Sequence, residues 1–425
     1  MNRVHALALA SALFFAGLPA GTARAADSEV VVLTSYPEEM TTRYEEAFER
    51  AHPGIDLRIV WQQGRDAMAT LRAQGRGGID VYWSPAAFNF PTLADEGAFL
   101  PLAVNRAEVP GKIGVQPISD PARRYEAFEV AGYGLAVNEK PLADKHIAMP
   151  SRWDDLANPA FDGLVVMPVP SEVGFAPGLY DVILQDKGWS AGWAMLSEMA
   201  ANASLAQRGG QILAPVIDGK AAAALAIDFL PRNAIAEGQP LTLIYPARTA
   251  FLPAYVAIVA SAPHPTAAKV FTDYVLSSAG QKLLFRREIN RYPIRPDAYR
   301  DIDSKIVNPF SVSPNATYAY DLSMGPARGP LISTLFNAAI TARQDKLRTL
   351  WRAIQAAEAK GATPATKEAR ALAGWVPVPD NDAVTAKVIM SFRPAKADAA
   401  PTAQMKAWAD ALDERQARAL ALVSK

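Results

Sequence analysis

The chain has 425 residues, half of them hydrophobic, and its 43 basic side chains equal its 43 acidic ones in number. A single hydrophobic core stops growing at about 250–300 residues, so this length predicts two or more packed units. The balanced charge argues against a nucleic-acid-binding protein, which normally carries a basic stripe or domain. The sequence contains no cysteine, which excludes disulfides, thiolate catalysis and cysteine-bound metal sites.

The first 25 residues have the pattern of a secretory signal peptide. Arg3 precedes an apolar stretch over residues 6–16, and Ala23-Arg24-Ala25 forms an A-x-A cleavage site. The apolar stretch is too short to span a bilayer, which requires about 20 residues. We therefore expect cleavage after Ala25 and export. Because no cysteine follows the cleavage site to carry a lipid anchor, the expected location is the periplasm of a Gram-negative bacterium.

Strands and helices alternate in the part of the chain that follows. Residues 30–33 predict a strand buried on both faces, and Ser35-Tyr36-Pro37-Glu38 fits an S-x-x-E capping box at the start of a helix. That helix is expected to end at His52-Pro53-Gly54. The next expected elements are a strand over 56–61, a helix over 66–74 and a strand over 79–83. This order predicts right-handed βαβ units and a parallel sheet.

A second α/β set follows a long extended segment over residues 125–137. We expect strands over 163–167, 222–227, 241–245 and 255–259, and helices over 180–185, 191–201, 266–276 and 279–285. Ligands of open α/β sheets bind at the carboxyl ends of the strands. Polar and aromatic side chains at these ends are therefore the candidates for a binding site.

The character of the sequence becomes helical from about residue 301. We expect helices over 330–355, with Pro330 in the first turn, and over 366–372, 380–389 and 402–422, and a surface loop over 394–401. The sequence thus predicts an all-α region after the α/β part.

Four ordered motifs stand out along the chain: Val31–Glu38, Asp80–Trp83, Trp153–Leu156 with Pro159 and Gly163, and Arg291–Arg295. Together they resemble the type 2 periplasmic substrate-binding proteins of ABC importers, most closely the branch that contains ferric-iron and phosphonate binders. The resemblance covers about residues 28–300. It implies a two-lobe α/β fold with parallel or mixed sheets and flanking helices, to which this chain adds a C-terminal all-α extension.

The resemblance also implies how the chain is divided. The first lobe is expected to comprise residues 26–131 and 250–300, the second lobe 132–249, and the helical extension 301–425, with hinge strands near 132–137 and 245–251. Ligand binding is expected to close the two lobes. Within the branch, three further features are similar to a periplasmic regulatory protein that works with a membrane sensor kinase: Lys187–Trp193, Pro215–Asp218 and the helical tail.

Five of the nine candidate ligand-binding residues are serines or arginines. Ser35, Ser84 and Ser171 follow expected strands, where free N–H groups and the helix dipole favour an anion. Ser35 could instead merely cap its helix, and Glu172, a weaker candidate beside Ser171, would repel an anion. Arg65 and Arg208 could each bind a carboxylate or phosphate through two hydrogen bonds, or could be ordinary surface arginines.

The other four candidates are aromatic or acidic. Tyr36, Trp83 and Tyr133 could stack on a ligand or donate a hydrogen bond to it, or could belong to the core or the rim of the site. Asp228 could accept hydrogen bonds from a ligand or could order the hinge. Ferric-iron relatives carry adjacent tyrosines at this point, whereas this chain has Phe229-Leu230, so ferric iron is not expected.

The remaining motifs favour a binding protein over an enzyme. His52, His146 and His264 show no metal-ligand spacing, and the sequence has no G-x-S-x-G, H-E-x-x-H or G-x-x-x-x-G-K motif. We expect no metal, no cofactor and no catalytic residues. The predicted function is a monomeric periplasmic protein that captures a small polar, anionic ligand, phosphorylated or carboxylated, for an ABC permease. The alternatives are a ligand-sensing partner of a membrane sensor kinase and an exported hydrolase.

Overall fold

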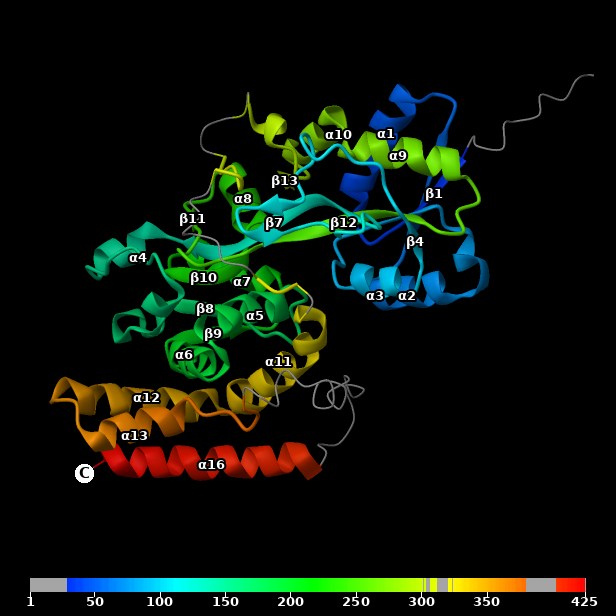
Figure 1. Cartoon of the computed structure of the whole chain (residues 1–425). Helices are drawn as coiled ribbons and strands as arrows, with labels where there is room; N and C mark the ends of the chain where they lie inside the picture. Colours follow the sequence, from blue (N-terminus) through cyan, green and yellow to red (C-terminus); the bar gives the residue numbers. More distant parts are fainter. Residues whose placement is uncertain are drawn as a thin grey trace, which may run out of the picture.

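The computed structural model describes residues 29–300, 302, 306–311, 320–322, 324–379 and 403–424. The expected signal peptide and its cleavage site, the helix over 380–389 and the loop over 394–401 lie outside these ranges. The described residues form two α/β lobes followed by a group of helices, which confirms the expected fold class (Figure 1). Among the described helices, none has both the length and the hydrophobicity of a membrane-spanning segment.

The sheet of the first lobe has the strand order β2-β1-β3-β12-β7. The bounds of these strands are Asp56–Trp61 for β2, Glu29–Thr34 for β1, Val81–Ser84 for β3, Phe251–Val259 for β12 and Glu126–Val137 for β7. β1 pairs in parallel with both β2 and β3, while β12 is antiparallel to β3 and β7. The apolar side chains of β1 are buried, as expected for a strand covered on both faces.

Helices cover both faces of this sheet (Figure 1). α1 (Glu38–Ala51) and α9 (Pro265–Leu276) lie on one face, and α2 (Gly64–Arg72) and α3 (Asn89–Asp95) lie on the other. The smaller elements of this lobe are β4 (Phe99–Leu100), β5 (Lys112–Ile113), β6 (Gln116–Pro117), α10 (Ser278–Lys282) and β13 (Tyr292–Pro293).

The predicted capping box of α1 is wrong. Pro37 is the N-cap of α1 and no side chain caps the helix. The hydroxyl of Ser35 lies two residues before the N-cap and faces the hydroxyl of Ser84 instead, at 3.0 Å. The end of the helix is as expected, because α1 finishes at Ala51 with His52 as its C-cap.

The sheet of the second lobe continues the order as β7-β10-β8-β9, with β11 also paired to β7. Its strands are β8 (Val165–Pro168), β9 (Ala203–Ala206), β10 (Ala223–Ile227) and β11 (Thr242–Ile244). β8 is parallel to β9 and β10, so the carboxyl ends of these strands lie at one edge. The helices are α4 (Glu139–Asp144), α5 (Ala176–Lys187), α6 (Trp189–Ala201), α7 (Gly210–Ile217) and α8 (Phe229–Ala236).

β7 belongs to both sheets. Its first half, up to Gly132, pairs with β12, and its second half, from Tyr133, pairs with β10. The chain returns to the first lobe between β11 and β12. A Cβ atom on Gly132 would lie 2.7 Å from the rings of both Phe251 and Tyr245, so only glycine allows this close approach of the two crossings.

In the described part of the C-terminal region the helices are α11 (Gly325–Ala339), α12 (Gln344–Ala359), α13 (Pro364–Ala373) and α16 (Ala403–Val423). The single helix expected over 330–355 is wrong, because the chain breaks between α11 and α12 at Thr341–Arg343. There the buried Arg343 turns inward and donates to the carbonyls of Ala338 and Ala409, which ties the break to α16. Pro330 lies inside α11 and not in its first turn.

The described residues form two hydrophobic cores. The first contains buried side chains from residues 30–130 and 251–294, and the second contains side chains from 133–250 together with 320–419. The extension therefore shares the core of the second lobe. Two tryptophans link the two parts: Trp189 donates to the Val378 carbonyl at 2.7 Å, and Trp351 donates to Ser197 Oγ at 3.0 Å.

Candidate ligand-binding site

Two serine hydroxyls meet at the carboxyl edge of the first lobe. β1 and β3 are adjacent and parallel, so the residues that end them, Thr34 and Ser84, lie at the same edge. Ser35 Oγ is 3.0 Å from Ser84 Oγ, and Ser84 Oγ also accepts from the Ala86 N–H at 3.1 Å. Ser84 is buried and Ser35 is half-buried. The structure thus brings together two of the three predicted serines, at the edge where ligands of such sheets bind.

Beside this pair, a buried carboxylate joins Tyr36 to an arginine. The Tyr36 hydroxyl donates to Glu129 Oε1 at 2.8 Å, and Arg291 Nη1 donates to the same oxygen at 2.9 Å. Glu129 Oε2 has no hydrogen-bond partner in the described part of the chain. Burial raises the pKa of the Glu129 carboxyl, although Arg291 opposes the shift. Because Arg291 also lies 4.6 Å from the ring of Phe229, it contacts both lobes.

Asp228 connects the two crossings between the lobes. It follows β10, is buried, and its Oδ2 accepts from the Gly132 N–H at 2.6 Å and from the Tyr245 hydroxyl at 2.9 Å. Burial raises the pKa of Asp228 from its usual 3.8 to about 6, against the opposing charge of Arg232. Of the two roles predicted for Asp228, these contacts favour ordering of the hinge.

A second set of contacts joins α8 to the first lobe. Arg232 Nη1 donates to the Asn290 carbonyl at 3.1 Å, and its guanidinium lies 3.7 Å from the centre of the Tyr292 ring. Asn290 Nδ2 donates to Asn233 Oδ1 at 2.8 Å. These groups hold the lobes together beside Asp228.

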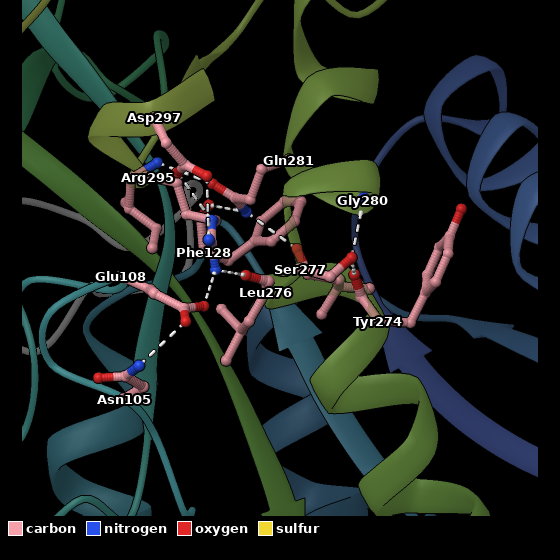
Figure 2. Close-up of polar contacts among 12 residues, drawn as sticks. Asn105, Glu108, Phe128, Tyr274, Leu276, Ser277, Gly280, Gln281, Arg295 and Asp297 are labelled. Atoms are coloured by element: carbon pink, nitrogen blue, oxygen red, sulfur yellow. Dashed lines mark hydrogen bonds and ion pairs between the residues drawn. The ribbon is translucent and has the colours of Figure 1, made fainter. Parts of the chain in front are cut away.

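A buried glutamine, Gln281, holds the segment that follows Arg291 and Tyr292, and Figure 2 shows it among its polar contacts. Gln281 Nε2 donates to the carbonyls of Phe128 at 2.8 Å and Val275 at 2.9 Å, and its Oε1 accepts from the Ile294 N–H at 2.8 Å. The β7–β12 ladder has a bulge at Phe128, since it pairs the residues on either side of Phe128 and skips it. Gln281 thus supplies the partner that the ladder does not give to the Phe128 carbonyl.

The predicted aromatic residues lie in the interior. Trp83 is fully buried, with ring centroids 4.9 Å from Tyr36 and 5.2 Å from Phe128, and its indole N–H has no hydrogen-bond partner within the described ranges. Tyr133 is also buried, which raises the pKa of its hydroxyl, and a Cβ atom on Gly178 would lie 2.6 Å from that oxygen. These placements agree with the core alternative for Tyr36, Trp83 and Tyr133.

The remaining predicted residues are dispersed. Ser171 is exposed after β8, with its hydroxyl 3.2 Å from Glu172 Oε1 and 3.3 Å from Asn337 Oδ1. Arg208 is exposed in the loop before α7. Arg65 is in the first turn of α2, and its side chain lies outside the described parts of the molecule. In this structure Ser171 and Arg208 make no hydrogen bond to Ser35 or Ser84.

Sequence reasoning missed Glu129 and Arg232 and treated Arg291 only as part of a family motif. Glu129 left a signal, because a carboxylate within a long apolar strand must find a partner when it is buried. Nothing in the sequence pattern identifies Arg291 or Arg232 as site residues, because their partners come from elements far away in the sequence. Across the residues that the structure describes, no cluster of three or more His, Asp or Glu side chains could hold a metal ion.

Comparisons with known proteins place this geometry in a family. The family described as bacterial extracellular solute-binding protein matches residues 88–312. The phosphoglycerate transport regulatory protein PgtC of Salmonella typhimurium strain LT2 is 30% identical over 253 residues, which cover 59% of this chain and 62% of PgtC; PgtC of Salmonella typhi gives the same values. The chain therefore spans less than two thirds of the length of these relatives. This similarity confirms the narrower resemblance expected from the sequence.

Solved structures share the fold. The periplasmic binding protein AfuA from Actinobacillus pleuropneumoniae, with fructose-6-phosphate bound, has a TM-score of 0.56 at 16% identity, covering 76% of this chain and 97% of AfuA. Iron-bound HitA from Pseudomonas aeruginosa has a TM-score of 0.56 at 18% identity, covering 72% of this chain and 98% of HitA. Because the family match extends over more than half of the chain, the protein belongs to the bacterial extracellular solute-binding proteins.

Proposed function

We propose that the protein binds a small anionic ligand, phosphorylated or carboxylated, in the cleft between its lobes in the periplasm and delivers it to an ABC permease. The observation that carries the proposal is the Ser35–Ser84 hydroxyl pair, 3.0 Å apart at the carboxyl ends of adjacent parallel strands. Hydroxyl and N–H donors at such an edge suit oxyanions. The fructose-6-phosphate bound to AfuA and the phosphoglycerate in the name of PgtC support a phosphorylated ligand.

The proposed mechanism is capture without chemistry. The lobes, 26–131 with 250–300 and 132–249, close about the crossings near 132–137 and 245–251, because only the closed state contacts the ligand from both sides. The proposed contacts are the hydroxyls of Ser35, Ser84 and Ser171, with further donors from the arginines predicted in the neighbouring loops. Asp228 joins the two crossings around which this motion is proposed, and Arg291 contacts both lobes beside them.

A second function keeps the ligand and changes the partner. The regulatory name of PgtC and the helical extension, which simple delivery to a permease does not require, favour a periplasmic partner of a membrane sensor kinase. A permease gene beside the gene for this protein would support delivery, and a kinase gene there would support sensing. In either case the ligand leaves unchanged and the protein acts as a monomer without nucleic acid.

Thermal unfolding of residues 26–425 tests the proposal. The ligands are 2- and 3-phosphoglycerate, phosphoenolpyruvate, fructose 6-phosphate, inorganic phosphate and succinate, with ferric iron as a contrast. A ligand at a hundred times its Kd should add about 2.7 kcal/mol to the free energy of unfolding. The Ser35→Ala, Ser84→Ala double variant should lose this shift, measured against its own ligand-free midpoint, which should be lower than that of the unchanged protein because the Ala86 N–H loses its acceptor. No shift with any anion would refute the proposal, and conversion of the ligand into a product would support the hydrolase alternative.

A further inference from the structure

The first helix of the extension lies against the loop that carries Ser171. Ser333 in α11 donates to the Pro170 carbonyl at 3.1 Å, and Ser171 Oγ is 3.3 Å from Asn337 Oδ1 in the same helix. Pro170 and Ser171 follow β8, at the carboxyl edge of the second sheet. α11 is therefore an immediate neighbour of the loop in which the second lobe is proposed to bind the ligand.

The side-chain amide of Asn337 has N–H groups that are not used as hydrogen-bond donors within the described ranges. Its Oδ1 lies 3.3 Å from the hydroxyls of both Ser171 and Thr341, which sets the oxygen toward them. Asn337 as a whole is half-buried, and its Nδ2 group makes no hydrogen bond to another described residue. Ser171 has one hydroxyl proton, and Glu172 Oε1, at 3.2 Å, competes with Asn337 for it. This loop thus holds its donors in weak or unused bonds, and an oxyanion replaces them once the exposed carboxylate of Glu172 turns away from Ser171.

The other end of α11 reaches the first lobe. A Cβ atom on Gly325, the first residue of α11, would lie 3.0 Å from Cε1 of Phe88. Phe88 follows Ser84 by one short loop, so this end of the helix lies near the serine pair of the first lobe. Figure 1 shows α11 extending from beside α3 to the underside of the second lobe. One helix therefore connects the two lobes, and because Gly325 and Asn337 lie about 18 Å apart along it, the proposed closure has to bring the serine pair toward Ser171 before one ligand contacts both.

We propose that α11 forms a wall of the ligand cleft and that Asn337 is a ligand-binding residue. Its amide N–H groups donate to a phosphate or carboxylate oxygen of the ligand, beside the hydroxyl of Ser171. The inference rests on the proposed function, which places the ligand at Ser171. It extends the binding site into the helical extension, so that the extension takes part in choosing the ligand.

Isothermal titration of the mature chain with the six anions tests the inference. Asn337→Asp keeps the size of the side chain, removes the donors and adds a negative charge. Because a hydrogen bond to a charged group contributes about 1.5–3 kcal/mol, this variant should weaken binding by about tenfold or more. Thr349→Asp is the matched control, since it adds the same charge at an exposed position of α12 and should leave the Kd unchanged.

Three outcomes are distinguishable. Weaker binding by Asn337→Asp, with Thr349→Asp unaffected, supports the inference. If Asn337→Asp unfolds early, Asn337→Leu removes the donors without adding charge and should also weaken binding. If the Asn337 variants bind like the control while the Ser35, Ser84 double variant does not bind, the inference is overturned and the proposed function stands. If the unchanged protein binds none of the six anions, the proposed function fails and the inference fails with it.

Discussion

Replacement of Gln281 by leucine should destabilise the first lobe strongly. The side chain of Gln281 is fully buried and makes three hydrogen bonds, to the carbonyls of Phe128 and Val275 and to the N–H of Ile294. Leucine has a similar size but makes none of them, so three buried backbone groups would lose a partner. Each unsatisfied group costs about 1–3 kcal/mol, and the apolar replacement returns about 1–2 kcal/mol. We expect a net loss of about 3–5 kcal/mol.

Urea unfolding followed by tryptophan fluorescence and circular dichroism measures this loss. The midpoint of the transition that reports the first lobe should fall, with its slope unchanged, because the variant alters stability and not the surface exposed on unfolding. Gln404→Leu, at an exposed position of α16, is the control and should shift no transition. A loss below about 1 kcal/mol for Gln281→Leu would show that the bulge carbonyl finds another partner, and the account of β7 given above would be wrong.

Three further predictions concern the hinge and the extension. The pKa of Asp228 is about 6 in the folded protein, above its usual 3.8, so the folded state binds the proton more tightly than the unfolded state. The free energy of unfolding should therefore fall by about 2–3 kcal/mol as the pH rises from about 4 to 6. Asp228→Asn should remove this fall in unfolding curves recorded at each pH, and an unchanged pH dependence would contradict the assignment. Arg328→Met should cost about 3 kcal/mol in urea unfolding, because the ion pair of Arg328 with Asp181 at 3.2 Å is buried and its loss leaves a lone charge; a loss near zero would indicate that Asp181 is already protonated. Gly374→Val should lower the thermal midpoint by the equivalent of about 1–3 kcal/mol, since even a Cβ atom there would lie 2.4 Å from that of Ala194, and an unchanged midpoint would mean that α13 shifts freely on α6.

Most of the fold could be predicted because its elements carry local signals. The β2 strand has the expected bounds, and β10 and α9 differ from expectation by one residue at one end. The errors lie where contacts distant in sequence decide the local structure. The break between α11 and α12 depends on the partners that Arg343 finds in α16, about 65 residues further along. The helical spacing of hydrophobic residues over 330–355 does not indicate those partners.

The candidate site could be predicted only in part, for a similar reason. The sequence places Ser35 and Ser84 after strands, and the parallel pairing of these strands brings the two hydroxyls together. Glu129 in β7 and Arg291 after α10 are far apart in the sequence. They meet only because both chain segments of the first lobe pack together. Asn337 lies beside Ser171 only because the extension docks on the second lobe, and no spacing rule reports a contact across 166 residues.

The shared core of the second lobe and the extension has a mechanical consequence. Because α12, α13 and α16 are built into that core, they cannot move independently of the second lobe. Figure 1 shows α16 as the layer farthest from the first lobe and from the two crossings between the lobes. In the proposed closure, in which the second lobe turns about those crossings, the extension moves with that lobe, and α16, the element farthest from the crossings, moves the greatest distance. In that proposed motion, the binding of a small ligand between the lobes displaces the outer surface of the extension.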